Sequence, residues 1–390
     1  MSDMRLSAAA IAASGTGAPV VAGVLGVGSL VARGPDAGPF LHGQLAADVA
    51  GLATGRATRS LLLNHRGHAM AEATVARDSQ EWLVIVEDDM LDWVHATLAE
   101  HIIFDDVTLA RGAAATVTVQ GAGALAALNA VLPEVVLDGA PDAGAPVKGV
   151  PFWRGVHVSG LSVVVYPRRR SAAGGYDLTL LGADRPAPGG SHVAAAAQDA
   201  AANAAADAAT DAAAGAAADA AALAAAALEA AARSLVAELV AAGAVAVTSA
   251  AIDAARVAAR VTTAGRDGGA GVLPQEADLT SAVSYRKGCY LGQEVMARIE
   301  ARGNLKRGLA TLELVARRGD DAVDVEAPYV EAGTAGADEA GARAIELNGR
   351  TVGVLGTTAL MPDGRVLALG VVRRDLEEGT VVTAGGRELR

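Results

Sequence analysis

The stretch 287–294, with the sequence KGCYLGQE, holds the most chemically distinctive residues of the chain. Its Cys289 is the only cysteine among 390 residues, and a thiolate can act as a nucleophile or as a metal ligand. Lys287 lies two positions earlier, and a nearby cation favours the thiolate form of a cysteine. We therefore treat Cys289 as a candidate functional thiol and Lys287 as the residue that activates it. The structural alternative is a buried cysteine that acts as a small apolar residue in a turn.

The neighbours of this cysteine add conformational and polar features. Gly288 and Gly292 predict a sharply turning backbone, because glycine lacks the Cβ atom that disfavours left-handed conformations. Gln293 and Glu294 supply hydrogen-bond donors, acceptors and a charge. Apolar and polar side chains then alternate, and this period of two predicts a strand over 295–300.

The composition limits the classes of protein to consider. A formal net charge of -12 argues against nonspecific nucleic-acid binding, so we expect no direct nucleic-acid contact. One cysteine permits no internal disulfide, which suits a cytoplasmic protein. It also cannot hold an iron–sulfur cluster alone, so any cluster involved would belong to a partner. The uncharged stretch 6–32 is rich in glycine and β-branched residues, which predicts a buried strand and no membrane segment.

Hydrophobic periodicity predicts helices and strands in alternation, and hence an α+β fold. The polar residues 64–68 separate two apolar runs and predict the tip of a hairpin. His65 and His68 have the spacing of metal ligands, but no third ligand is apparent, so we expect no metal site. Further strands are predicted at 82–86, 102–109, 116–119 and 161–166, and helices at 34–49, 90–101, 125–132, 228–242 and 252–261.

Three segments depart from this alternation. Residues 193–227 are nearly all alanine with polar residues at intervals of four, which predicts an exposed helical insertion that carries no chemistry. Residues 319–340 are acidic and predict a loop. The short strands and glycine turns after residue 304 predict a small β-barrel.

The pattern K-G-C-Y-x-G-Q-E resembles the signature of the YgfZ folate-binding family, whose relatives include the glycine-cleavage T protein, an aminomethyltransferase. The segments 34–49 and 273–276 are similar to that family as well. The resemblance implies a T-protein-like ring of subdomains with a central folate channel, followed by a C-terminal β-barrel. We therefore expect a folate-binding domain in two parts, 1–192 and 228–303, split by the insertion 193–227, and a barrel domain over 304–390.

The same resemblance implies tetrahydrofolate as the cofactor. In the aminomethyltransferase relatives a glutamate in a G-Y-E-I segment binds the pterin edge, and Tyr176 and Asp177 occupy the matching positions here. Because aspartate is one methylene shorter, its contact would be direct, water-mediated or absent; the structural alternative is an exposed strand acid. Arg256 matches the arginine of an R-I-E-A-G segment and would bind a folate carboxylate, unless it lies on a solvated helix face.

Other residues complete the expected folate site. Gly288, Gly292, Gln293 and Glu294 are assigned to it through the signature. The basic run 168–170 either meets the glutamate tail of a folate, because guanidinium pairs well with carboxylate, or forms a solvated hairpin tip.

The residues argue for a supporting role rather than for turnover. The T protein has an Asp pair in a G-x-I-x-D-D strand, and the matching stretch 67–72 ends in Ala71 and Glu72. A single, longer carboxylate does not hold the same geometry. We therefore expect a tetrahydrofolate-binding factor that supports assembly or repair of iron–sulfur enzymes, including tRNA-modifying ones, with those enzymes or assembly proteins as partners. An aminomethyltransferase-like one-carbon transferase is the alternative.

Overall fold

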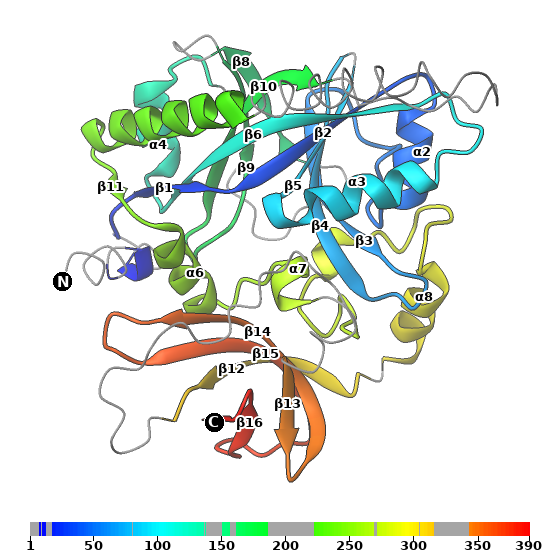
Figure 1. Ribbon diagram of the computed structural model, residues 1–390, viewed down its shortest axis with the longest axis vertical. Helices are drawn as coiled ribbons and strands as arrows, with labels where there is room; N and C mark the ends of the chain where they lie inside the picture. Colours follow the sequence, from blue (N-terminus) through cyan, green and yellow to red (C-terminus); the bar gives the residue numbers. More distant parts are fainter. Residues whose placement is uncertain are drawn as a thin grey trace, which may run out of the picture.

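The computed structural model describes residues 8, 10–12, 18–79, 81–135, 137, 150–156, 161–185, 222–268, 271–303, 305–315 and 343–390. These residues form two sheets with helices packed on and between them (Figure 1). Most of the predicted alanine-rich insertion, 193–221, and the acidic segment 319–340 lie outside the described residues. Within the described part of the chain, no helix is long and apolar enough to cross a bilayer.

The larger sheet has eleven strands and runs in the order β7-β3-β4-β5-β2-β6-β10-β9-β8, with β1 paired to β6 and to β11. The bounds are β1 Val21–Leu25, β2 Val27–Arg33, β3 Arg56–Leu63, β4 Ala69–Arg77, β5 Trp82–Glu87, β6 Thr108–Gln120, β7 Val150–Pro151, β8 Trp153–Val156, β9 Ser162–Pro167, β10 Gly175–Arg185 and β11 Val245–Ala246. The predicted hairpin tip at 64–68 joins β3 to β4.

The segment 150–156 joins the two edges of this sheet. β7 pairs with β3 at one edge and β8 pairs with β9 at the other, and Phe152 alone separates β7 from β8. Arg154 on β8 adds ion pairs of 2.6 Å to Asp78 and 2.7 Å to Glu81, in the β4–β5 turn. The sheet therefore closes on itself and has an inner and an outer face. The apolar part of the inner face consists of Val27, Val31, Ala57, Ala76, Leu83, Ile85, Val164, Tyr166 and Leu181.

Helices cover the outer face. α2 (Ala37–Gln44) and α3 (Leu91–Glu100) pack on β2, β4 and β5, and α4 (Ala124–Val131) and a helix at 222–241 pack on β6, β9 and β10. The helix at 222–241 is anchored by Leu228, Leu235 and Leu239, which are buried on one of its sides. This spacing agrees with the helix predicted from residue 228 onward.

The strand predicted over 102–109 is wrong for its first six positions, because β6 begins only at Thr108. Ile103 and Phe104 are 72% and 98% exposed, so these two apolar side chains face solvent instead of the core. Asp36 holds the loop instead: its Oδ2 accepts a 2.8 Å hydrogen bond from the backbone N–H of Asp106. Asp36 is the N-cap residue of α2, but its side chain makes no capping hydrogen bond to the helix.

The second sheet has the order β12-β15-β14-β13-β16-β17. Its strands are β12 Arg307–Glu313, β13 Ala344–Leu347, β14 Arg350–Leu360, β15 Val366–Arg373, β16 Val382–Ala384 and β17 Arg387–Leu389. The sheet is curled, and Glu313 and Arg390 exchange backbone hydrogen bonds of 2.8 and 3.0 Å between its two edges. The C-terminal part of the chain, predicted as a β-barrel, is therefore a curled sheet of six strands whose edges meet at Glu313 and Arg390. α6 (Ser249–Ala258) and α7 (Ala264–Asp267) lie between the two sheets (Figure 1).

The strand predicted over 295–300 is wrong, because this stretch lies in α8, which spans Gln293–Arg302. Gly292 has a φ of 81° and starts the helix, and Gly303 has a φ of 63° and ends it. The less exposed residues Val295, Met296 and Ile299 fall on one side of α8, at the spacing of a helix rather than of a strand. The sequence of this stretch is compatible with a helical period and with a strand period of two. The left-handed glycines at its two ends mark the limits of the helix that forms.

Candidate functional site

Buried charges from both halves of the larger sheet meet on its inner face. Glu72 on β4 and Glu87 on β5 lie opposite Asp177 on β10, and Arg168 and Arg170 come from the turn between β9 and β10. Together they line a cavity of about 20 Å³, which has room for about one water molecule. The two carboxylates that sequence reasoning singled out, Asp177 and Glu72, thus belong to one site.

Asp177 is fully buried and paired with Arg170. Arg170 Nε lies 3.2 Å from Oδ1 and 3.1 Å from Oδ2 of Asp177, and Nη2 lies 2.9 Å from Oδ2. The other end of the guanidinium, Nη1, is 3.4 Å from Glu87 Oε1. Burial alone lowers the pKa of Arg170, and the carboxylates of Asp177 and Glu87 raise it by more, so Arg170 stays charged. The exposed-acid interpretation of Asp177 is therefore wrong.

Glu72 is held between two guanidinium groups. Its Oε1 accepts a 2.7 Å hydrogen bond from Arg59 Nε and a further one from Arg168 Nη1. Burial raises the pKa of Glu72, but Arg168 and Arg59 lower it by more, so that it lies well below its usual range. The backbone N–H of Ala264 adds a 3.4 Å bond to Oε2. A carboxylate stabilised in this way is a weak general base, because its conjugate acid is strong.

The basic run 168–170 is not a solvated hairpin tip as a whole. Arg168 and Arg170 are buried, and only Arg169 between them is exposed, as alternation along an extended chain dictates. Gln120 fixes the backbone of this run: its Nε2 donates to the carbonyl of Arg168 at 3.0 Å, and its Oε1 accepts from the N–H of Arg170 at 2.9 Å. The backbone that carries both buried arginines is thereby held in place.

Two tyrosines on neighbouring strands differ in their relation to the cavity: the predicted Tyr176 lies outside it, and Tyr166, which sequence reasoning missed, lines it. Tyr176 packs in the apolar core under α4, on the opposite face from Asp177, because adjacent strand residues point to opposite faces. Tyr166 on β9 is the register partner of Asp177 and lines the cavity. Its hydroxyl lies 3.1 Å from Thr179 Oγ1, and burial and then Asp177 raise its pKa. The apolar run 161–166 predicts a buried strand and so indicates that Tyr166 is buried. The sequence does not show that Asp177 stands opposite it.

Arg256 is not at this cavity. It is 2% exposed on α6, so it does not lie on a solvated helix face. Its Nη1 lies 2.7 Å from Asp267 Oδ2, and its Nη2 donates to Thr357 Oγ1 on β14 at 2.7 Å. Arg256 therefore ties α6 and α7 to the second sheet.

The signature stretch 287–294 lies away from the cavity and is anchored by Lys287. The ammonium group donates to three backbone carbonyls, those of His42, Leu45 (2.5 Å) and Ala47 (3.1 Å). Two of these follow the end of α2, where the helix dipole favours a cation. Burial lowers the pKa of Lys287 to about 8, with an opposing effect of Asp48. Lys287 thus binds α2, and no hydrogen bond in the described structure joins it to Cys289.

Cys289 is exposed, which contradicts the buried-turn interpretation. Gly288 is also exposed, and a Cβ placed on it would meet nothing within 4 Å. Gly292 has a different role: a Cβ there would lie 2.6 Å from the carbonyl oxygen of Asn64, so it packs against the β3–β4 tip. Gln293 and Glu294 form the first turn of α8. None of these residues lines the cavity around Asp177.

The two histidines of the β3–β4 tip do not form a metal site in the described structure. His68 Nδ1 accepts a 2.9 Å hydrogen bond from the backbone N–H of Gly271. Over the residues with assigned positions, no group of three or more histidine, cysteine or acidic side chains has the geometry to hold a metal ion.

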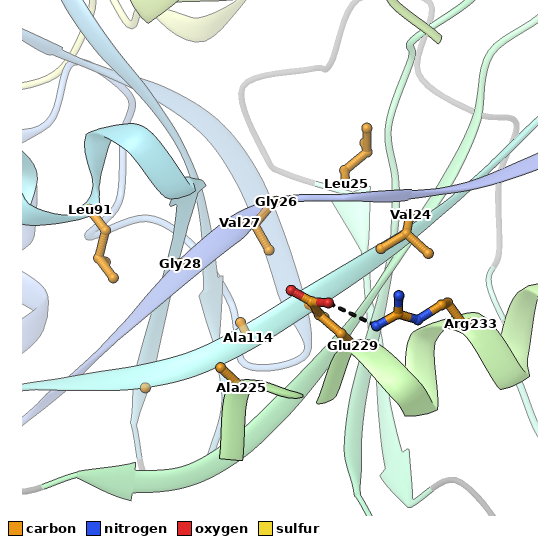
Figure 2. Close-up of a pocket in the computed structure, with 12 residues that line it drawn as sticks. Val24, Leu25, Gly26, Val27, Gly28, Leu91, Ala114, Ala225, Glu229 and Arg233 are labelled. Carbon is orange, nitrogen blue, oxygen red and sulfur yellow. Dashed lines mark hydrogen bonds and ion pairs between the residues drawn. The ribbon is translucent and has the colours of Figure 1, made fainter. Parts of the chain in front are cut away.

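A larger cavity of about 350 Å³ lies on the outer face, between α3 and the helix at 222–241 (Figure 2). It sits where β1 and β2 share one register against β6. Leu25 lies opposite Thr116 and Gly28 lies opposite Ala113, but the two positions between Leu25 and Gly28 have no register partner on β6. The charged residues of its lining, Glu229 and Arg233, pair with each other at 2.9 Å and are exposed. Val27 lines both cavities, which therefore lie on either side of the sheet at the same point.

Known proteins resemble this chain in sequence and in fold. Residues 21–141 match the family model described as GCVT N-terminal domain. Curated relatives named "tRNA-modifying protein YgfZ" are 31% identical over 112 residues in Klebsiella pneumoniae (28% of this chain, 29% of that protein) and 32% identical over 115 residues in Cronobacter sakazakii (28% and 29%). The matched region spans less than a third of the length of these relatives.

The crystal structure of glycine cleavage system aminomethyltransferase T from Bartonella henselae superposes with a TM-score of 0.60 at 17% identity, over 99% of this chain and 86% of that one. This likeness shows the fold, a mixed α and β architecture with a curled C-terminal sheet. The resemblance to YgfZ and to the T protein that the signature predicts is confirmed.

Proposed function

We propose that this protein is a YgfZ-like, tetrahydrofolate-binding factor that supports tRNA modification by maintaining iron–sulfur enzymes. The observation that carries the proposal is the convergence of Asp177 and Glu72, from the two halves of a T-protein-like sheet, on one buried polar cavity. The names of the curated relatives support the link to tRNA modification.

The residues at the cavity fit the polar edge of a pterin. That edge presents two N–H donors side by side, and Asp177 offers two acceptor oxygens in one plane. The apolar side chains of Val27 and Ile85, which lie on the inner face, line the same cavity and suit the flat ring. Because the present volume admits about one water, the ring needs the space now taken by arginine side chains. The predicted central folate channel along the inner face is part of this proposal.

Bound tetrahydrofolate would supply one-carbon carrier chemistry, and the chain's own residues argue against its turnover here. Glu72 stands where the T protein has its Asp pair, and both of its guanidinium partners keep it ionised and weakly basic. We therefore favour a binding and maintenance role over an aminomethyltransferase-like activity.

The exposed thiol of Cys289 supplies the second part of the proposal. An accessible cysteine on a loop anchored by Lys287 can meet a partner protein, whereas a buried one could not. We propose that iron–sulfur client enzymes or assembly proteins in the cytoplasm are those partners.

Calorimetry with tetrahydrofolate under anaerobic conditions tests the folate part. We expect saturable heat and thermal stabilisation for the wild type, because any ligand of the native state raises stability. Asp177→Asn should lose both signals while Arg169→Ala, at the exposed neighbour, keeps them. No heat and no stabilisation of the wild type at millimolar ligand would rule out the folate assignment. Complementation of a strain that lacks its own YgfZ-type factor tests the maintenance role, with tRNA thiolation as the readout.

A further inference from the structure

We infer that the Arg170 guanidinium occupies the place of the ligand's hydrogen-bond donors at Asp177. Competition with this internal stand-in, the guanidinium, then determines which ligands Asp177 binds. The inference rests on the proposed function, because it concerns the regulation and the selectivity of the same cavity. It assigns to Arg170 the role of a competitor for the carboxylate rather than that of a ligand-binding residue.

The pairing geometry carries the first step. Nε and Nη2 of Arg170 approach the two oxygens of Asp177 at 2.9 to 3.2 Å, as a fork of two N–H donors joined through one carbon. A 2-amino-4-oxopyrimidine ring presents the same fork through its N3–H and its 2-amino group. The guanidinium is charged and the pyrimidine edge is neutral, but both present two N–H donors in the same geometry, so they compete for one acceptor pair.

The available space carries the second step. The cavity beside Asp177 measures about 20 Å³, so a fused ring reaches the carboxylate only after the guanidinium has left. Gln120 holds the backbone of Arg168 and Arg170 by hydrogen bonds of 3.0 and 2.9 Å. The displacement is therefore a movement of the Arg170 side chain, with its backbone kept in place.

Glu87 carries the third step. It already lies 3.4 Å from Arg170 Nη1, and its side chain is only 15% exposed. A guanidinium that leaves Asp177 thus keeps a carboxylate partner, which removes the large penalty of burying an unpaired cation. Glu87 is the residue that makes the displacement feasible.

This arrangement has a consequence for affinity and for selectivity. The apparent affinity is the intrinsic affinity multiplied by the fraction of molecules in which Asp177 is free. Only a ligand that replaces both donor bonds can compete, because a ligand with one donor leaves a carboxylate oxygen unpaired in a buried site. The cavity should therefore select 2-amino-4-oxopteridines over 2,4-dioxopteridines, which lack the amino group.

The test compares Arg170→Lys with the wild type, using anaerobic tetrahydrofolate as the probe and calorimetry as the readout. Lysine keeps the positive charge but cannot form the two-donor fork, so we expect the dissociation constant to fall by about fivefold or more. Arg169→Lys, at the exposed neighbour, should leave it unchanged. Glu87→Gln should raise it, because the displaced guanidinium then has no carboxylate to move to. Pterin, but not lumazine, should compete with tetrahydrofolate.

The outcomes separate this inference from the proposed function. A wild type that binds tetrahydrofolate, with unchanged or weaker binding by Arg170→Lys, would overturn the stand-in role and leave the folate assignment in place. Absence of binding by the wild type and by Arg170→Lys alike would overturn both. Should Arg170→Lys fail to fold, Glu87→Gln decides alone, since tighter or unchanged binding by that variant contradicts the inference.

Discussion

Arg256 on α6 and Asp267 at the end of α7 form a buried ion pair of 2.7 Å between the two helices that lie between the sheets. The backbone N–H of Thr357 on β14 donates to the other Asp267 oxygen at 2.8 Å, and Arg256 donates to the Thr357 hydroxyl. Gly356 lies so close that a Cβ there would be 2.7 Å from Asp267 Oδ1. Arg256, which was predicted to bind a folate carboxylate, thus ties α6 and α7 to the second sheet.

Replacement of Arg256 by methionine should destabilise the protein strongly. The change leaves the Asp267 carboxylate buried without its cation, and breaking a buried pair in this way costs about 3–5 kcal/mol. Urea unfolding followed by circular dichroism measures the loss. Arg373→Ala, which removes an exposed pair with Asp375, is the control and should leave the midpoint nearly unchanged. A stable Arg256→Met protein that no longer binds tetrahydrofolate would instead restore the ligand-binding role.

Glu72 should make the free energy of unfolding fall in acid. Its folded-state pKa lies below the unfolded value of about 4.3, because Arg168 and Arg59 outweigh the effect of burial. As the pH falls, the unfolded chain takes up the proton first, so this contribution is complete above about pH 5 and is lost as the pH falls toward the folded pKa. Urea unfolding between pH 6 and pH 3 should show the decline. Glu72→Gln should make the unfolding free energy depend less on pH in this range. The dependence that remains comes in part from Asp267, whose pKa is also lowered.

The two glycines of the signature should respond differently to alanine. Gly292 has a φ of 81° and faces the Asn64 carbonyl, so Gly292→Ala should lose more than about 1 kcal/mol of unfolding free energy. Gly288 has open space around its Cα, and Gly288→Ala should stay within about 0.5 kcal/mol of the wild type. Thermal melts of the two variants measure the difference, and equal losses would contradict the assigned packing of Gly292.

Cys289 should react with iodoacetamide in the folded protein. Its side chain is exposed, so alkylation needs no unfolding, and Cys289→Ala should change the unfolding free energy by less than about 0.5 kcal/mol. Mass spectrometry in native buffer and in urea gives the two rates to compare. If the thiol is the functional group, Cys289→Ala keeps tetrahydrofolate affinity but fails to complement. Full complementation by the variant would leave the signature as an anchored turn.

Lys287→Met should loosen the signature loop without unfolding the domain. The change removes the ammonium hydrogen bonds to three backbone carbonyls in and just after the last turn of α2, of which the Ala47 carbonyl keeps another donor, the N–H of Val49. We expect a lower melting temperature and faster hydrogen exchange in residues 285–292. Lys287→Arg keeps the charge and should retain part of the protection. Unchanged exchange in both variants would show that Lys287 does not anchor the loop.

Elements whose pattern is local were predictable from the sequence. The helices around 91–100 and 124–131 and the hairpin tip at 64–68 follow from apolar spacing and polar interruption. The structure of residues 295–300 was not predictable in this way, because their apolar side chains fit the period of a strand and that of a helix. The stretch forms a helix that begins after the left-handed Gly292. The exposed Ile103 and Phe104 misled the strand prediction, since burial is not a local property.

The sequence alone determined the mixed α and β class, the resemblance carried by residues 287–294 and the choice of Asp177 as a candidate ligand-binding residue. Only the tertiary structure decided what these residues touch. Arg168 and Glu72 are 96 positions apart, and Lys287 and Leu45 are 242 apart. Such partners follow from strand order and from the closure of the sheet through 150–156, and alternation along a single strand does not encode either. Periodicity fixes the face on which a side chain lies, whereas packing between distant segments fixes its partner.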